Sequence, residues 1–251
     1  MIEEKFASGQ SFIHKLDPKT RIVAVIILSF AAALCDIFFV AVLYFIISTV
    51  LIVMARLNRK DVIERIKPVF WFLLMIWILI PITFDGQILY QFSWLKISGT
   101  GVILCCKITI KSITILLLFT SLVATMSIAS LGNGLHKLYV PDKLIFLLLM
   151  SYRYIAVIED EYKKLLRAAK FRGFRPKTNL HSYKTFAYLA GMLFVRASFR
   201  AQRVHQAMLC RGFNQKFHSL DIYQANRFNF IFLIGISAAG LSLVILEKIW
   251  I

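Results

Sequence analysis

Two arginines occur in the same short sequence context at two places in the chain. Each is followed by glycine and phenylalanine, in the runs Phe171-Arg172-Gly173-Phe174 and Cys210-Arg211-Gly212-Phe213. A planar guanidinium binds a carboxylate through two hydrogen bonds and keeps its charge when buried. Glycine just past a helix supplies the left-handed cap that ends it. The pattern therefore predicts two helices whose tips each present an arginine to a carboxylate on another molecule.

A single arginine beside a cap glycine has a simpler explanation, because a cation at the end of a helix stabilises the helix dipole. Two copies, in a strongly basic segment flanked by hydrophobic spans, favour a paired docking device instead. The residues expected to dock are Phe171, Arg172 and Gly173 at the first tip and Cys210, Arg211 and Gly212 at the second.

The helix that leads to the second tip carries one apolar stripe. From Ser182 to Arg211 it would be about 45 Å long at roughly 1.5 Å per residue. Its apolar side chains recur mostly at three- and four-residue steps, which places them on one face. They are Tyr183, Phe186, Ala190, Leu193, Ala197, Val204 and Met208. A different face carries Arg196, Arg200 and Arg203.

Acidic residues predict where the helix of the first tip starts. The run Glu159–Glu161 precedes several lysines and arginines, and acids favour the first turn of a helix while cations favour the last. We therefore expect this helix to run from Glu159–Glu161 to Phe171. A separate helix is expected to start at Asp142 and continue to Ile158. Its apolar part is too short to cross a bilayer, so we expect it at the inner interface or buried against other helices.

The composition indicates a membrane protein. The chain has 251 residues, of which 59% are hydrophobic and only 17% charged, and its mean hydropathy is +0.73. Of its 30 lysines and arginines, 17 lie between residues 130 and 227 and five between residues 55 and 67. Basic residues beside hydrophobic spans mark cytoplasmic segments, so this asymmetry accounts for the net charge of +17 without nucleic acid.

Hydrophobic runs define the spans. One crossing of the hydrocarbon core takes about 20 residues, so Ile22–Met54 is interpreted as a helical hairpin broken at Cys35-Asp36. Further spans are predicted at Pro68–Phe84, Val102–Ala129 and Phe228–Leu246. Roughly five crossings follow from a cytoplasmic N-terminus.

Smaller signals mark the ends of these helices. Asp17 is a predicted N-cap, with Pro18 at the first helical position. Lys107 and Lys111 are expected to extend from the fourth span to the headgroups. A short amphipathic piece is expected after the glycines that end at Gly134.

Together these features predict an all-α polytopic membrane bundle with a cytoplasmic pair of long coupling helices. The expected parts are an N-terminal transmembrane bundle over residues 1–129, the coupling helices over residues 130–226, and a C-terminal transmembrane helix over residues 227–251.

Motifs for independent chemistry are missing from the sequence. The five histidines are scattered outside the spans, without metal-ligand spacing, and no Gly-rich phosphate loop occurs. Ion-coupled carriers usually need carboxylates within the membrane, and the predicted spans hold almost none. We therefore expect neither an enzyme nor a self-sufficient transporter, and no metal or ATP bound by this chain.

These residues resemble the transmembrane T component of energy-coupling factor (ECF) transporters, and within it the cobalt type, CbiQ. The resemblance covers nearly the whole chain. It rests on Leu16–Thr20, Val140-Pro141 and Ser151–Tyr154, and most specifically on the tip motifs Ala168–Pro176 and Arg200–Phe213. The family's usual tip is Ala-Arg-Gly; Phe171 and Cys210 stand at the alanine positions, while the arginine and glycine are kept.

The resemblance implies a non-catalytic, multi-pass subunit of a prokaryotic plasma membrane. In such transporters each Arg-Gly tip lies in a groove on one of two cytoplasmic ATPase subunits, which bind the ATP. Closure of the ATPase dimer moves the long helices, whose apolar faces hold a membrane subunit that binds the substrate.

The resemblance further implies cobalt uptake in support of cobalamin synthesis, with the metal bound by the partner subunit. Nickel or a vitamin remains open as the substrate. A stand-alone carrier or enzyme is the alternative of a different class.

Overall fold

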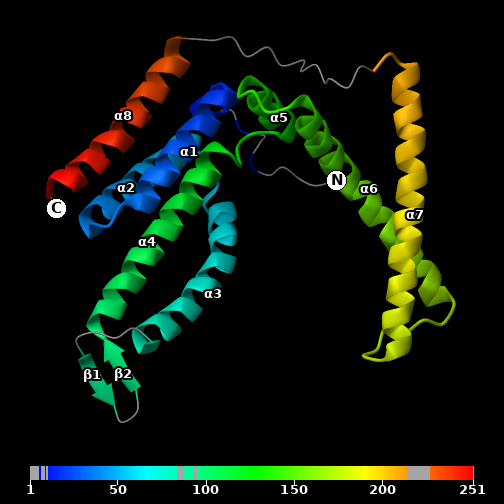
Figure 1. Cartoon of the computed structure of the whole chain (residues 1–251), viewed down its shortest axis with the longest axis horizontal. Helices are drawn as coiled ribbons and strands as arrows, with labels where there is room; N and C mark the ends of the chain where they lie inside the picture. Colours follow the sequence, from blue (N-terminus) through cyan, green and yellow to red (C-terminus); the bar gives the residue numbers. More distant parts are fainter. Residues whose placement is uncertain are drawn as a thin grey trace. The chain divides into compact units, whose positions relative to one another are not determined.

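The computed structural model of the chain describes residues 6, 9, 11–83, 88–92, 95–213 and 227–250. Helices make up nearly all of this part of the chain, as predicted (Figure 1). The α-helices are α1 (Pro18–Leu34), α2 (Phe38–Ala55), α3 (Arg59–Thr83), α4 (Gly99–Leu122), α5 (Ile128–Lys137), α6 (Asp142–Phe171), α7 (Leu180–Cys210) and α8 (Arg227–Trp250). A short 3-10 helix, η1 (Phe12–Lys15), precedes α1.

The described residues form two units. One comprises residues 6–134 and 227–250, and the other comprises residues 135–213. The first unit holds α1 to α4 and α8, and the second holds α6 and α7, with α5 leading from one to the other. The divisions expected after residues 129 and 226 stay predictions.

In the first unit, α1 and α2 form the predicted hairpin. The chain leaves α1 at Leu34 and enters α2 at Phe38, so the break at Cys35-Asp36 is confirmed. At the other end of α1, the Asp17 side chain accepts a hydrogen bond from the backbone N–H of Lys19 at 3.1 Å. The predicted cap of α1 is therefore confirmed too.

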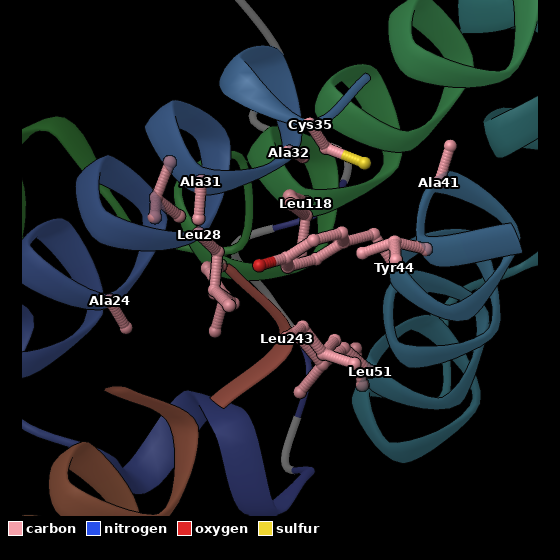
Figure 2. Packing of buried hydrophobic residues seen from close by; sticks show 14 of the residues in the cluster. Ala24, Leu28, Ala31, Ala32, Cys35, Ala41, Tyr44, Leu51, Leu118 and Leu243 are labelled. Carbon is pink, nitrogen blue, oxygen red and sulfur yellow. The ribbon is translucent and has the colours of Figure 1, made fainter. Parts of the chain in front are cut away.

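The core of this unit lies where α1, α2, α4 and α8 meet. Figure 2 shows the ring of Tyr44 crossing from α2 toward Leu28 of α1, between Leu118 of α4 and Leu243 of α8. The Tyr44 hydroxyl donates a hydrogen bond to the Gly240 carbonyl of α8 at 2.7 Å. The buried hydroxyl of Tyr44 therefore has a hydrogen-bond partner, and this bond connects α2 to α8.

Two helix boundaries differ from the prediction. α3 starts at Arg59 and contains Pro68 in its interior, so Pro68 does not begin the helix. α4 ends at Leu122 rather than continuing to Ala129. Proline is tolerated within a transmembrane helix because neighbouring groups can satisfy the carbonyl that it leaves free. A proline alone was therefore a poor guide to where this helix begins.

The predicted short amphipathic piece is present as α5, but it starts at Ile128, so Gly132 and Gly134 lie inside it rather than before it. A Cβ atom at Gly134 would lie 2.8 Å from Cδ1 of Ile22 and 2.9 Å from Cβ of Pro18. Gly134 therefore lets α5 approach the start of α1 closely, rather than marking a loop.

A small antiparallel hairpin, β1 (Ile88–Phe92) and β2 (Leu95–Ser98), joins α3 to α4. The sequence did not predict it. Ser98 then caps α4, since its side chain accepts from the backbone N–H of Gly101 at 3.4 Å.

Three of the described helices, α2, α3 and α4, are long and apolar enough to cross a membrane. α8 contains a shorter apolar stretch, Asn229–Ile245, and α1 has 17 residues. These lengths agree with a helical membrane bundle. The number of crossings, roughly five, stays a prediction.

The tip of the α1–α2 hairpin is held by charged side chains from two distant helices. Glu247 of α8 is only 6% exposed, and its carboxylate accepts the backbone N–H groups of Asp36 and of Ile37, the latter at 2.9 Å. Lys111 of α4 donates to the Ala33 carbonyl at 2.9 Å. Lys111 therefore caps the end of α1, whereas the sequence analysis expected it to extend to the headgroups.

Replacing Glu247 by alanine should detach this end of α8. A hydrogen bond to a charged group contributes about 1.5–3 kcal/mol, so we expect the free energy of unfolding to fall by about 2 kcal/mol. Thermal unfolding in detergent measures the loss. Asp36→Asn is the control, because the Asp36 side chain is 86% exposed and lies 3.8 Å from Lys111, and such exposed pairs contribute little. Equal losses from both variants would contradict a capping role for Glu247.

Candidate functional site

The first Arg-Gly tip ends α6 in a complete Schellman motif. The N–H of Gly173 donates to the Lys170 carbonyl at 3.0 Å, and the N–H of Phe174 donates to the Ala169 carbonyl at 3.1 Å. Gly173 has φ +84°, and a Cβ at this position would meet nothing within 4 Å. The glycine is required by backbone conformation and not by crowding. The predicted left-handed cap is confirmed.

The second tip ends α7 with the same geometry. The N–H of Gly212 donates to the Leu209 carbonyl at 2.9 Å, and the N–H of Phe213 donates to the Met208 carbonyl at 3.0 Å. Gly212 has φ +74°. Two helix ends therefore present arginine in the same backbone setting, one residue before a left-handed glycine.

Both arginines are available for an external partner. Arg172 and Arg211 are exposed, and within the described part of the chain neither side chain forms an ion pair. The residues before them are also open, since Phe171 is 91% exposed and Cys210 is exposed as a free thiol. A large aromatic side chain in water on a helix end is typical of an unoccupied contact surface.

The phenylalanine after each glycine packs back onto the other helix of the pair. The ring centroid of Phe174, after α6, lies 5.5 Å from that of Phe186 in α7. The ring centroid of Phe213, after α7, lies 5.4 Å from that of Phe146 in α6. Such aromatic contacts fix the direction in which the chain leaves each helix. Each tip is therefore anchored against the neighbouring helix.

α6 is a single helix from Asp142 to Phe171, so the prediction that a new helix starts at Glu159–Glu161 was wrong. Glu159 pairs within α6 with Lys163 at 2.6 Å. This hydrogen bond lowers the pKa of Glu159 and raises that of Lys163. The acidic run therefore follows the i,i+4 pairing of a continuing helix.

α7 starts slightly earlier than predicted, at Leu180, and its cap is Asn179. The Asn179 side chain accepts from the backbone N–H of Ser182 at 3.0 Å. The Ser182 hydroxyl, in turn, accepts from the backbone N–H of Lys177 at 3.0 Å. The short connection between the two helices is thus tied to the first turn of α7.

One carboxylate links the two helices. Glu161 of α6 accepts from Arg196 at 3.1 Å through Oε2 and from Arg200 at 3.0 Å through Oε1. Lys164 lies 3.7 Å from Oε1, and the Glu161 side chain is 16% exposed. The prediction that Arg196 and Arg200 lie on a different face of α7 from the apolar stripe was wrong, because both line the same groove between α6 and α7 as Leu193. Glu161 was not identified as their partner from sequence.

The hydrogen bond from Arg196 is the main cause that lowers the pKa of the Glu161 carboxyl below its ordinary value, and the nearby charges of Lys164 and Arg200 act in the same direction. Because this pKa is lowered, the ionised carboxylate stabilises the link between α6 and α7 at pH values above the ordinary carboxyl pKa. The contribution is lost as pH falls through the lowered value. The link is therefore intact at neutral pH.

Around this link, α6 and α7 leave an apolar groove of about 410 Å³. Four members of the predicted apolar stripe line it from α7, namely Leu193, Ala197, Val204 and Met208. Phe186 contacts Phe174 instead, while Tyr183 is 61% exposed and Ala190 is exposed. The predicted stripe therefore mostly faces α6.

A second apolar stripe runs along the opposite side of α7. Its members recur at four-, three- and four-residue steps, and all are exposed. They are Tyr188, Met192, Val195 and Phe199. The signal was present in the sequence, since this spacing is as regular as that of the first stripe. A helix that is apolar on two sides is expected to be covered by more than one neighbour.

Comparison with known proteins identifies relatives over most of the chain. Residues 9–220 match the family model CbiQ, described as cobalt transport protein. The energy-coupling factor transporter transmembrane protein EcfT of Listeria innocua is 28% identical over 225 residues, covering 85% of this chain and 84% of the relative. The Bacillus subtilis protein of the same name is 25% identical with the same coverage. That of Leuconostoc gelidum is 26% identical over 92% of both chains.

Proposed function

The chain belongs to the CbiQ family of cobalt transport proteins, and we propose that it is the transmembrane coupling subunit of an ECF-type importer. In this role it joins two cytoplasmic ATPases, which bind the ATP, to a membrane subunit that binds the substrate. The chain itself catalyses no reaction. Its task is to transmit the movement of the ATPases to its partner in the membrane.

The observation that carries this proposal is the pair of matching helix ends. Arg172 and Arg211 occupy the same position in two Schellman motifs, and both are exposed. A helix dipole needs only one cation near each C-terminus and sets no requirement on its exact cap geometry. Two arginines in one geometry fit two equivalent acidic grooves, as a dimer of identical or homologous ATPases would offer.

The exposed stripe of α7 supports the membrane side of the proposal. Tyr188 and Phe199 are 76% and 59% exposed, which is unfavourable in water but suits a lipid-facing or protein-covered position. We propose that this face contacts the substrate-binding subunit. Tyr183 and Ala190 of the predicted stripe, on the other side of α7, stay predicted contacts of the coupling helix.

We propose cobalt as the transported ion, supporting cobalamin synthesis, because the family is described by cobalt transport. The relatives named EcfT carry no substrate in their names, so nickel and vitamins are the competing substrates to test. In each case the substrate would be bound by the partner subunit.

Capture of partners from host membranes tests the proposal. The tagged chain, purified in mild detergent, should bring two ABC-type ATPase subunits and a small membrane protein with it. The assembled complex in liposomes should take up Co²⁺ only with ATP, and excess Ni²⁺ should compete weakly. Uptake by the isolated chain without ATPases would instead establish a stand-alone carrier.

A further inference from the structure

Glu161 and the two arginines that it binds lie at a special position between the tips. Eleven residues separate Glu161 from Arg172 along α6, and eleven separate Arg200 from Arg211 along α7. At 1.5 Å per residue each arm is about 16 Å long. The link therefore lies equally far from both arginine tips. α6 continues from the link to the first tip, and α7 continues from the link to the second tip. The two tips therefore lie at the ends of two arms that both start at the link.

The groove explains why the Glu161 link matters for the angle between α6 and α7. A volume of about 410 Å³ remains between the helices, so apolar side chains such as Val157 and Leu193 line open space there rather than interlocking across it. Close helix packing would fix the crossing angle through many side chains. Beside the groove, α6 and α7 are joined by the Glu161 link, and near the ends by the two phenylalanine contacts.

We propose that Glu161, with Arg196 and Arg200, is the pivot that sets the angle between α6 and α7 and thereby the distance between the two docking tips. The inference rests on the proposed function. Glu161 is a positioning residue, since it acts through the arms and touches neither substrate nor ATPase. A change of about 10° at the pivot would move each tip by about 3 Å along these arms.

The charges explain why one carboxylate suffices as a pivot. Each oxygen of Glu161 binds a different arginine, and Arg196 and Arg200 are one helical turn apart. This arrangement holds a fixed point on α6 against a fixed length of α7, and two bonds from separate oxygens restrict rotation of one helix against the other. Without the carboxylate, two guanidinium groups would face α6 beside Lys164, and like charges would drive the helices apart.

The test measures the distance between the two arms in the full complex. Spin labels on non-natural amino acids at Arg167 of α6 and Gln206 of α7, both exposed, report the angle while Cys210 at the second tip is kept. We expect one narrow distance distribution for the parent chain. Each label lies six residues from the link, on an arm of about 9 Å, so a change of about 10° moves it by about 1.6 Å. Glu161→Gln should therefore broaden the distribution and shift it by about this distance, and should lower uptake per ATP hydrolysed several-fold while the ATPases stay bound.

Glu159→Gln is the matched control, because Glu159 makes its ion pair with Lys163 within α6. It removes the same charge without touching α7 and should leave the distance and the uptake unchanged. Glu161→Arg combined with Arg196→Glu and Arg200→Glu restores opposite charges across the helices. This reversed variant should recover the narrow distribution.

Two results would overturn the pivot. One is an unchanged distance and coupling ratio in Glu161→Gln. The other is failure of the reversed variant to recover them although it enters the membrane and keeps the thermal stability of the parent chain. Both are distinct from failure of the proposed function, in which the parent chain would not capture ATPases at all.

Discussion

Arg172→Glu and Arg211→Glu are each expected to weaken capture of the ATPases by about 30-fold to several thousand-fold. The reason is that a carboxylate in the ATPase groove would be left unpaired and desolvated, which costs roughly 2 to 5 kcal/mol. An exposed arginine that served only its own helix end would lose well under about 1 kcal/mol. The size of the loss in binding free energy therefore distinguishes the two interpretations. Binding of the purified chain to immobilised ATPases measures the loss, and the double variant should not assemble.

The neighbouring Arg175 provides the control for this experiment. It is exposed and lies past the cap of α6, so Arg175→Glu changes the same charge without changing the tip. Arg172→Gln and Arg211→Gln separate loss of the arginine from the unfavourable effect of an acid at a helix C-terminus. Similar, mild losses from all three glutamate variants would show that only a diffuse basic surface is needed, and the two-tip docking model would be wrong.

The tips could be predicted from sequence because their chemistry is local. Gly173 and Gly212 adopt positive φ for reasons contained within six residues of chain, and glycine is the residue that does so without strain. The same holds for Asp17, whose cap bond reaches only two residues ahead. Signals of this kind do not depend on what packs nearby.

The start of α6 at Asp142 was predicted, but its continuation through Glu159–Glu161 could not be predicted in this way. Glu159–Glu161 has the charge expected of a first helical turn, yet no glycine, proline or capping side chain interrupts the helix before it. Its acids are instead satisfied by Lys163 four residues ahead and by two arginines of α7. A run of acidic residues indicates that cationic partners exist, but not whether these partners lie on the same helix.

The orientation of α7 shows a second limit. Its two apolar stripes have equally regular spacing, and only the stripe through Leu193 and Ala197 faces α6. Periodicity identifies a face but not the neighbour that covers it. In the structure, the bonds from Arg196 and Arg200 to Glu161 lie on the same side of α7 as the stripe that faces α6.

Docking at two tips at once makes the length of α7 between the pivot and the second tip critical. Insertion of four helix-forming residues after Gln206 should lengthen this arm by about 6 Å and rotate its end by about 40°. The cap at Gly212 would move with its local bonds to Met208 and Leu209, but Phe213 would lose its contact with Phe146. The tip would therefore be intact but misplaced.

If both tips must dock on one rigid ATPase pair, this insertion abolishes simultaneous binding. Two linked contacts can gain roughly 10²- to 10⁴-fold in affinity over one, and the gain disappears when geometry prevents both from forming. We expect affinity for the ATPase pair to fall to that of Arg211→Glu, and ATP-driven uptake to be lost. The same four residues inserted after Pro176 lengthen only the connection between α6 and α7 and leave both arms unchanged, so this control should retain most of its affinity. Equal losses from the two insertions would mean that the tips bind one at a time, and the distance between them would then have no role in coupling.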